Sequence, residues 1–280
     1  MSVEMIPVHS SPSIGARLWS FAAKTFNLGS VLSFLLLLVL LGTWQYSVRA
    51  GWVPAFVLPA PTDVASRIIA DISDQVIWYD SLYSLTEIVA GFLIALCCGI
   101  FIGVFVALVP LVDRIVTPYI VALQTIPKVA IAPVLIIWFG FGITSKIVIV
   151  ALIDFFPILV NVVLGFRSIN PRQLVLMKVL DASPWQIFCK VRVPNALPSI
   201  MAGVHIAMIL SVIGAIVGEF LGSPHGLGAQ IMQRQASMDV VGVYSVLAIL
   251  TCIGILLNTL VKLISRKIVF WGNSENPQGL

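Results

Sequence analysis

The chain has 280 residues, of which 59% are hydrophobic and only 10% are charged, and its mean hydropathy is +1.06. Soluble domains carry about 25% charged residues, so this composition excludes a single water-soluble core and indicates lipid as the solvent. The net charge of +4 does not indicate a nucleic-acid partner, because the basic residues lie in short segments between long apolar runs.

Six apolar runs are each long enough to cross a hydrocarbon core about 30 Å thick, which takes about 20 helical residues. We expect an all-α polytopic membrane protein with spans at 28–48, 85–109, 115–139, 146–166, 197–221 and 240–264. In the second span Gly91, Gly99 and Gly103 recur at a spacing that lets two helices approach closely. Three prolines interrupt the third span, at positions 118, 127 and 133.

These spans divide the chain into an N-terminal segment (1–27), a transmembrane domain (28–265) and a C-terminal tail (266–280). The first apolar run lacks a clean small-residue cleavage site, so we interpret it as a helix and not as a signal peptide. Six spans put both termini on one side, and most of the 16 lysines and arginines fall on that side. The positive-inside rule therefore predicts that both termini are cytoplasmic.

The segment between the first two spans, residues 51–84, begins with three prolines that keep it extended. Thr62 is then a good N-cap for a short helix. Apolar residues follow at near-helical spacing up to Val76, which predicts an amphipathic helix at the outer interface. Membrane packing and docking of a partner are both open roles for this helix.

The loop at 167–198, between the fourth and fifth spans, carries helical signals of its own and is expected in the cytoplasm. Asn170 and Pro171 predict the N-cap and first residue of a short helix. This helix is expected to run to about Leu180. Asp181 then suits a turn, because a short polar side chain tolerates left-handed geometry.

A second short helix is predicted from Pro184 to Val191. Ser183 is its expected N-cap, and Gln186 three residues later completes a capping box. Two further prolines, at positions 194 and 198, are expected to end this helix before the fifth span.

Trp185 and Phe188 are the large aromatic residues of this second helix. An exposed Trp–Phe pair is typical of an anchor for a partner protein. The alternative is that both rings pack under the helices of the same bundle. The residues alone leave these two interpretations open.

This loop resembles the EAA loop of ABC importer permeases, in which Glu-Ala-Ala is followed by Gly and then by an Ile-x-Leu-Pro ending. Val191, Val193 and Pro194 match that ending at the family's spacing. Asp181 stands where the family has Gly, and Val-Leu-Met at 175–177 stands where it has Glu-Ala-Ala. The loop is divergent in its first half and faithful in its second.

The resemblance covers roughly residues 55–265 and is closest to the nitrate, sulfonate and taurine branch of the family. The matching segments are Leu-Pro-Ala-Pro at 58–61, Ser-Leu at 84–85, Gly-Phe at 91–92, Ile-Pro-Lys-Val-Ala-Ile-Ala-Pro at 126–133, Trp-Phe-Gly-Phe-Gly at 138–142, Ser-Lys at 145–146, Gly-Glu at 218–219 and Gly-Leu-Gly at 226–228. Each segment is weak alone, and their order and spacing together are specific.

The resemblance implies a type I permease subunit of the bacterial inner membrane, which forms half of the channel and pairs with a second permease copy as a homodimer. It implies two ATPase subunits that bind ATP and Mg, no cofactor on this chain, and an extracytoplasmic solute-binding protein. The residues implied to dock into the ATPase subunit are Asp181, Ala182, Ser183, Pro184, Trp185, Gln186, Phe188, Val191 and Pro194. The branch implies a small anion such as sulfonate, taurine or nitrate, and a vitamin precursor (pyrimidine or riboflavin) is the alternative.

Polar residues inside the spans are candidates for the translocation pathway, because charges in a bilayer are costly. Lys128 follows the break at Pro127, where it can meet an anionic solute, or it can pair with a carboxylate or reach an interface. Asp154, in the middle of the fourth span, is a hypothetical partner for Lys128. Gln124 and Thr125 precede the break and are expected to line the pathway.

Glu219 lies near the outer end of the fifth span, before a turn-rich loop at 222–226. It is a candidate for a gate in the pathway. The alternative, which we prefer, is a helix-end carboxylate bonded to loop amides.

The sequence has no Gly-x-x-x-x-Gly-Lys-Ser/Thr loop, no Ser–His–Asp arrangement and no cysteine spacing typical of a metal site. We therefore expect no enzyme activity, and energy must come from a partner or a gradient. A stand-alone secondary transporter with an intramembrane charge relay is a further alternative. The capped cytoplasmic helices and the lack of an obvious inverted repeat argue against it.

Overall fold

The computed structural model describes residues 28–271. The expected N-terminal segment 1–27 lies outside these residues, as does the expected tail beyond residue 271. The chain divides into two compact units, Met1–Asp63 and Val64–Leu280. All regular elements between residues 28 and 271 are helices, as the sequence predicts.

The first unit contains α2 (Leu28–Arg49), which matches the predicted first span, and the start of α3 (Pro61–Ile72). The prediction that Thr62 caps α3 is wrong, because the helix already begins at Pro61, whose fixed φ suits the first helical position. The Thr62 hydroxyl instead accepts hydrogen bonds from Gln45 (3.2 Å) and Arg49 (3.1 Å).

The predicted second span begins earlier than its apolar run. Helix α4 (Gln75–Leu108) starts at an N-cap, Asp74, whose carboxylate accepts a hydrogen bond of 2.9 Å from the Val76 amide. Val76 therefore belongs to α4, and the prediction that the amphipathic helix reaches it is wrong. The extension adds polar residues to the helix, including Asp80 and Ser84, both of which are buried.

The predicted third span is broken in two. Helix α5 (Pro110–Thr125) is followed by the short 3₁₀ helix η1 (Lys128–Ile131) and by α6 (Ala132–Phe139), and the two parts meet at 79°. The bend lies at Ile126, which is extended (φ −68°, ψ 128°) because the following Pro127 disfavours helical geometry in the residue before it.

The remaining helices are α7 (Ile143–Arg167), α8 (Pro171–Val179), α9 (Pro184–Ile187), the π turn η2 (Phe188–Arg192), α10 (Val193–Phe220), α11 (Leu227–Ala236) and α12 (Val240–Ile268). Within the described residues, five helices are long and apolar enough to cross a membrane, and the bent third pair makes a sixth if it is one span. The six predicted spans agree with this, whereas α11 was not predicted.

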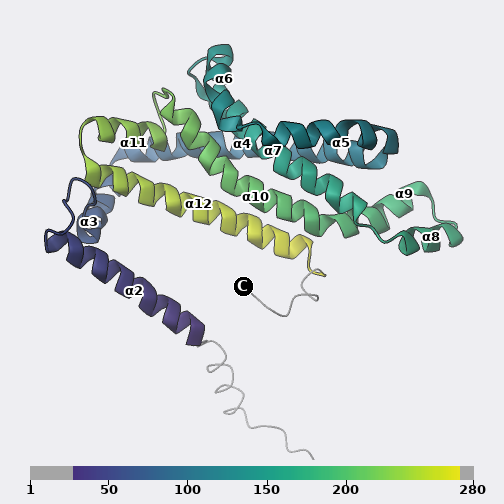
Figure 1. Ribbon diagram of the computed structural model, residues 1–280, viewed down its shortest axis with the longest axis horizontal. Coiled ribbons are helices and arrows are strands. Elements are labelled where there is room, and N and C mark those ends of the chain that lie inside the picture. The colour runs from purple at the N-terminus through teal and green to yellow at the C-terminus, as the bar shows by residue number, and fades with distance from the viewer. Residues whose placement is uncertain (1–27, 272–280) are drawn as a thin grey trace, which may run out of the picture. The chain divides into compact units, whose positions relative to one another are not determined.

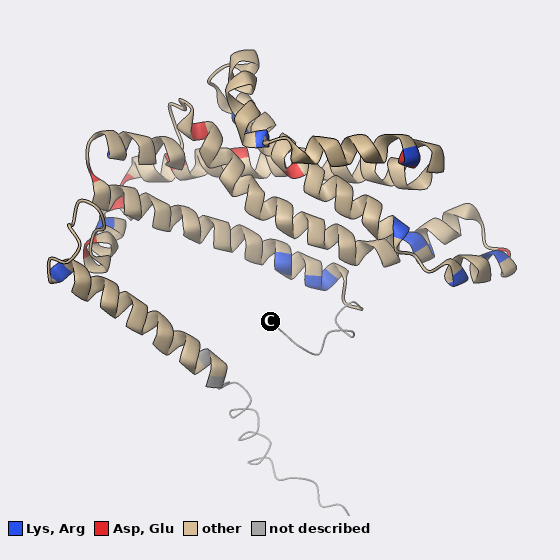
Figure 2. Cartoon of the chain, in the orientation of Figure 1, with Lys and Arg blue, Asp and Glu red and all other residues tan. Residues whose placement is uncertain are grey.

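In the second unit α4, α7 and α10 pack side by side along their lengths, and α12 lies against α10 (Figure 1). Helix α11 lies at one end of this bundle, called here the α11 end. Helices α8 and α9 lie at the other, called here the α8–α9 end. Lysines and arginines gather on α8, on the π turn η2 after α9 and in the last turn of α12, whereas the α11 end carries most of the unit's carboxylates (Figure 2).

The glycines of α4 make a close contact with α7. A Cβ atom on Gly91 would lie 2.5 Å from Val150 Cβ and 2.8 Å from the Ile147 carbonyl, both on α7. Gly99 and Gly103 face α7 in the same way. The prediction of close approach is confirmed, and the contact is one that no larger residue can keep.

The prediction that Pro194 and Pro198 end the second loop helix is wrong. The chain stays helical from Pro184 to Phe220. In the π turn the Val193 amide donates to the Phe188 carbonyl, five residues back, instead of four. This wider turn lies directly before Pro194, which has no N–H to donate, so the helix continues where a regular α-helix loses a bond.

We expect Gly91→Ala to lower the melting temperature of the detergent-purified protein. The added methyl group overpacks the contact with α7, which lowers the free energy of unfolding by about 1–3 kcal/mol. Gly254→Ala is the matched control, because its Cβ would meet only Val212 Cγ2 at 3.8 Å. Both changes gain the same helix propensity, about 1 kcal/mol. Equal melting temperatures for the two variants would contradict the close contact.

Candidate functional site

The loop between α7 and α10 is folded by local capping, as its sequence predicts. The Asn170 side chain accepts a hydrogen bond of 3.0 Å from the Arg172 amide. Asp181 has a left-handed backbone, with φ of 53°. The capping box is complete, because the Ser183 amide donates to Gln186 Oε1 (2.9 Å) and the Gln186 amide donates to Ser183 Oγ (3.3 Å).

The two aromatic residues of this loop have different environments. Phe188 is half-buried and stacks between Phe166 of α7, with centroids 6.0 Å apart, and Trp185, with centroids 5.7 Å apart. The outer ring, Trp185, is 71% exposed. Phe188 therefore packs on the bundle, whereas Trp185 is presented outward, and a partner role for Trp185 stays a prediction.

An apolar groove opens beside Trp185. Its volume is about 660 Å³, and it is lined by Leu108, Lys178, Pro184, Trp185, Ile187, Phe188 and Arg192. Further exposed apolar side chains lie on α8 and the turn after it, namely Val175, Leu176, Val179 and Leu180. The docking residues Ala182, Val191 and Pro194 lie in the same loop, partly buried, so the structure brings the predicted residues together at one end of the bundle.

The predicted pathway residues are not brought together. Gln124, Thr125 and Pro127 are exposed at the bend between α5 and η1. Lys128 Nζ donates to the Gln124 carbonyl (3.2 Å) and lies 5.0 Å from the centre of the Phe156 ring. No carboxylate among residues 28–271 forms an ion pair with it.

The hypothesis that Asp154 pairs with Lys128 is wrong. Asp154 is fully buried between α7 and α10, where it accepts a hydrogen bond of 2.5 Å from the Ser211 hydroxyl. The Lys128 side chain instead reaches back along its own segment. Lys128 contacts the Phe156 ring on the same helix as Asp154, whereas the Asp154 carboxylate is bonded to Ser211 of α10.

Glu219 bonds to loop amides, which is the alternative preferred from the sequence. Its carboxylate accepts from the Gly228 amide and from the Ser84 hydroxyl, the latter at 2.6 Å. It is 1% exposed and lies at the α11 end. The structure therefore places Glu219 in a polar cluster that fixes α11, away from Lys128 and its neighbours.

This polar cluster supplies acceptors for the first amides of α11, which has no side-chain cap of its own. The Gly226 amide donates to Asp80 (2.9 Å), and the Leu227 amide donates to Ser84 (2.8 Å). Gly226 has φ of +110°, which favours glycine, and a Cβ there would meet the Glu219 carboxyl group. Acceptors from α4 and α10 thus replace an N-cap.

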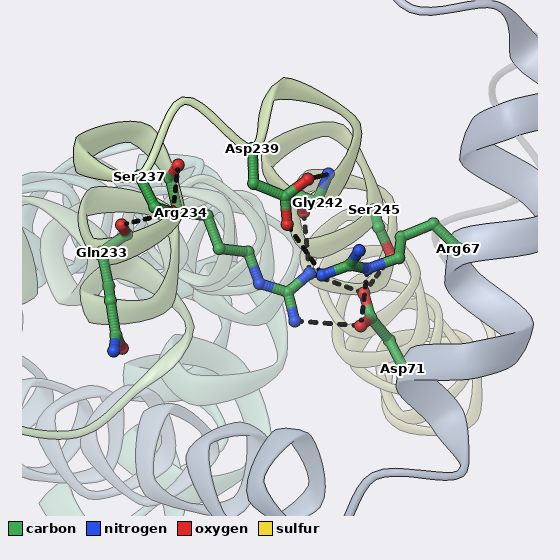
Figure 3. Close-up of polar contacts among 8 residues, drawn as sticks. All are labelled: Arg67, Asp71, Gln233, Arg234, Ser237, Asp239, Gly242 and Ser245. Carbon is green, nitrogen blue, oxygen red and sulfur yellow. Dashed lines mark hydrogen bonds and ion pairs between the residues drawn. The ribbon is translucent and has the colours of Figure 1, made fainter.

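A second buried cluster, missed in the sequence, holds the other end of α11 (Figure 3). Arg234 donates to both oxygens of Asp71, at 2.6 and 2.9 Å, and Ser245 donates to Asp71 at 2.5 Å. Arg67 bridges Asp71 (3.3 Å) and Asp239 (2.7 Å). This network, which we call the Asp71 clasp, joins α3 to α11 and α12.

The Asp71 clasp keeps its central carboxylate charged. Burial raises the pKa of Asp71. The hydrogen bonds from Arg234 and Ser245 and the charges of Arg234 and Arg67 lower it, and together they outweigh burial, so the pKa lies below its usual value. A depressed pKa means that the carboxylate stabilises the fold fully above the unfolded pKa of about 3.9. That contribution is lost as the pH falls through the folded pKa.

The fold and these sites describe a helical membrane protein with a loop of short capped helices at one end. Residues 99–270 match the family described as "Binding-protein-dependent transport system inner membrane component". The chain therefore belongs to the family of inner-membrane components of binding-protein-dependent transport systems. Members of this family are transport components and not enzymes, and they are proteins of the inner membrane.

Several relatives have names that state a solute. The chain is 38% identical over 236 residues (84% of this chain, 88% of the relative) to "Riboflavin transport system permease protein RibX" of Chloroflexus aurantiacus. It is 35% identical over 244 residues (87% and 96%) to "Formylaminopyrimidine transport permease protein ThiX" of Halalkalibacterium halodurans. It is 27% identical over 240 residues (84% and 87%) to "Taurine transport system permease protein TauC" of Escherichia coli.

Among solved structures, the chain resembles the MetNI methionine ABC transporter in inward-facing conformations, with a TM-score of 0.60. The match covers 70% of this chain and 99% of that chain at 20% identity, which supports the fold alone. The predicted type I permease fold is confirmed.

We expect Asp71→Asn to speed hydrogen–deuterium exchange across α3. Arg234 then stays buried without a counter-charge, which destabilises the fold by about 3 kcal/mol. The wild type should gain the same fast exchange, after correction for intrinsic rates, as the pH falls below about 3.9. Asp74→Asn is the control, since asparagine caps α4 about as well as aspartate. Unchanged exchange in Asp71→Asn would show that the clasp does not hold α3.

Proposed function

We propose that this chain is the permease subunit of an ABC importer, coupled through α9 to a separate ATPase subunit. The observation that carries the proposal is the exposure of Trp185. Its side chain is 71% exposed at the edge of an apolar groove, on a helix whose N-terminus is closed by a capping box. A large exposed aromatic beside a groove is the usual form of an interface anchor. Membership of the transport family supports this over a stand-alone secondary transporter.

The docking surface in this proposal is more apolar than the family pattern implies. Val175 and Leu176 are exposed at positions where the family has residues of the Glu-Ala-Ala motif. Val179, two residues beyond these positions, is exposed as well. Lys178 and Arg192 line the groove and are placed to meet carboxylates on the ATPase subunit. The partner therefore offers an apolar surface with an acidic rim.

Two copies of the chain form the pathway in this proposal, and two ATPase subunits bind ATP and Mg. Their closure moves the α9 helices, and the bundle changes from inward-facing to outward-facing. Solute then enters from an extracytoplasmic binding protein and is released inward on relaxation. The basic α8–α9 end and the basic last turn of α12 support a cytoplasmic location for that end of the bundle (Figure 2). Both termini are cytoplasmic in this proposal.

We expect Trp185→Ala to weaken association with the ATPase subunit by about 2 kcal/mol, or roughly 30-fold, with the fold intact. Co-purification of the ATPase subunit with the tagged chain measures this. Trp138→Ala is the matched control, because Trp138 is equally exposed (73%) but lies on α6. Undiminished co-purification with Trp185→Ala would count against docking at α9.

The solute in this proposal is a small anion such as a sulfonate, taurine or nitrate. Lys128 supports this, because its side chain is only half-buried and no carboxylate between residues 28 and 271 pairs with it. It lies at the bend of the broken third span, where the backbone is irregular. Irregular backbone at membrane depth is tolerated where it lines a cavity or is buried in protein.

A vitamin precursor is the second candidate for the solute. The relatives named for riboflavin and formylaminopyrimidine transport are 38% and 35% identical to this chain, more than the taurine permease at 27%. The binding protein that delivers the solute decides between these candidates.

We expect Lys128→Met to lower ATP-driven uptake of an anionic solute about tenfold, the effect of about 1.4 kcal/mol of lost attraction. Lys128→Arg keeps the charge and should retain most uptake. Vesicles containing the reconstituted importer and its binding protein give the measurement, with taurine and riboflavin as the two probes. Equal riboflavin uptake by wild type and Lys128→Met, with no taurine uptake by either, would favour the vitamin precursor.

A further inference from the structure

Glu87 is a buried acid that the proposed import mechanism does not use. It lies on α4 at the α11 end and is 0% exposed. Neither of its carboxyl oxygens has a hydrogen-bond partner among the described residues. A carboxylate removed from water without a donor is strongly destabilising, so the site needs a further positive charge or a proton.

Lys146 does not supply the missing partner. Its side chain is fully buried close to Glu87 and Glu219, but its ammonium group donates to the carbonyls of Phe141 and Gly142. No ion pair joins it to a carboxylate within residues 28–271. Lys146 therefore adds charge to the cluster and fixes the loop before α7, while both oxygens of Glu87 stay unbonded.

The remaining neighbour of Glu87 is a second acid, Glu219 of α10, whose carboxyl group lies within hydrogen-bonding reach. Glu219 already accepts hydrogen bonds from Ser84 and from the Gly228 amide. Two ionised carboxylates have only acceptors to offer each other. A single proton on Glu87 turns the pair into a donor and an acceptor.

The charges around the pair agree with one proton. Glu87 from α4 and Glu219 from α10 face Lys146 from α7, which leaves one negative charge in excess. Tyr83 on α4 is the other titratable group beside Glu87 and is neutral in its ordinary state.

The groups further out belong to the loop before α11. Asp80 accepts from the Gly226 amide and from Gln230 (2.6 Å), and the His225 ring lies 3.8 Å from Asp80. His225 is half-exposed and packs on Tyr79.

We infer that Glu87 and Glu219 form a proton-binding site at the α11 end, in which Glu87 carries one proton and donates a hydrogen bond through it to the Glu219 carboxylate. The proton completes the polar cluster that holds the first amides of α11 against α4 and α10. This site is separate from the docking loop and from Lys128, and it does not depend on which solute is carried.

Infrared spectroscopy of the purified full-length chain tests the site directly. The wild type should show a protonated-carboxyl C=O band, shifted in D₂O, that Glu87→Gln removes. Glu87→Gln should keep the wild-type melting temperature at neutral pH, because its amide also donates to Glu219. Glu219→Gln should melt lower, since its amide group faces the donors Ser84 and Gly228.

The pH dependence gives a second readout. The proton is bound in the folded protein, so the wild type should lose stability as the pH rises through its release, whereas Glu87→Gln should not. Glu87→Ala is the control that removes the donor together with the side chain, and it should melt below Glu87→Gln.

Three results would overturn the proposal. The first is a wild-type spectrum without a carboxyl band that Glu87→Gln removes. The second is equal damage from Glu87→Gln and Glu87→Ala. The third is a wild-type melting temperature that depends on Na⁺ or K⁺ and loses this dependence in Glu87→Gln, which would assign the site to a metal cation instead.

Discussion

The structure depends on the rule that polar backbone groups inside a membrane protein must find partners within the protein. Helix α11 shows this most clearly, because its first amides bond to Asp80, Ser84 and Glu219 from two other helices. The acids that satisfy these amides are themselves costly to bury, so each must in turn be bonded. One requirement therefore generates a connected cluster, and it fixes where α4, α10 and α11 lie at this end of the bundle.

The same requirement explains the irregular segments. At the Ile126–Pro127 bend the helix is interrupted, and Lys128 donates to the Gln124 carbonyl that the break leaves open. At the π turn before α10 the hydrogen-bond register widens by one residue, and the helix continues through Pro194. Both are places where proline removes a donor, and their outcomes differ: Ile126 before Pro127 is extended, whereas Val193 before Pro194 stays helical (φ −62°, ψ −51°).

Features set by neighbours in the chain were predictable, whereas those set by distant residues were not. The capping box joins Ser183 and Gln186, which are three residues apart. The left-handed backbone of Asp181 is a preference of that residue type itself. The Asp71 clasp joins residues 163 positions apart, and no local pattern indicates that pairing. Glu87 carried a usable signal, a carboxylate inside an apolar run, but its partner depends on how α4 and α10 pack. Helix α11 has only ten residues, and four of them are polar, so its amphipathic pattern was hidden in an apparent loop.

The unbroken helix from Pro184 to Phe220 has a mechanical consequence. Its 37 residues, at about 1.5 Å each, make a rod roughly 55 Å long. The rod begins beside Trp185 and ends one residue beyond Glu219. A push on the first turn cannot be absorbed by a flexible linker, because there is none between the two ends. Under the proposed docking, a displacement at the ATPase subunit therefore reaches the acid pair along one continuous helix, and the α11 end responds without a relay of separate elements.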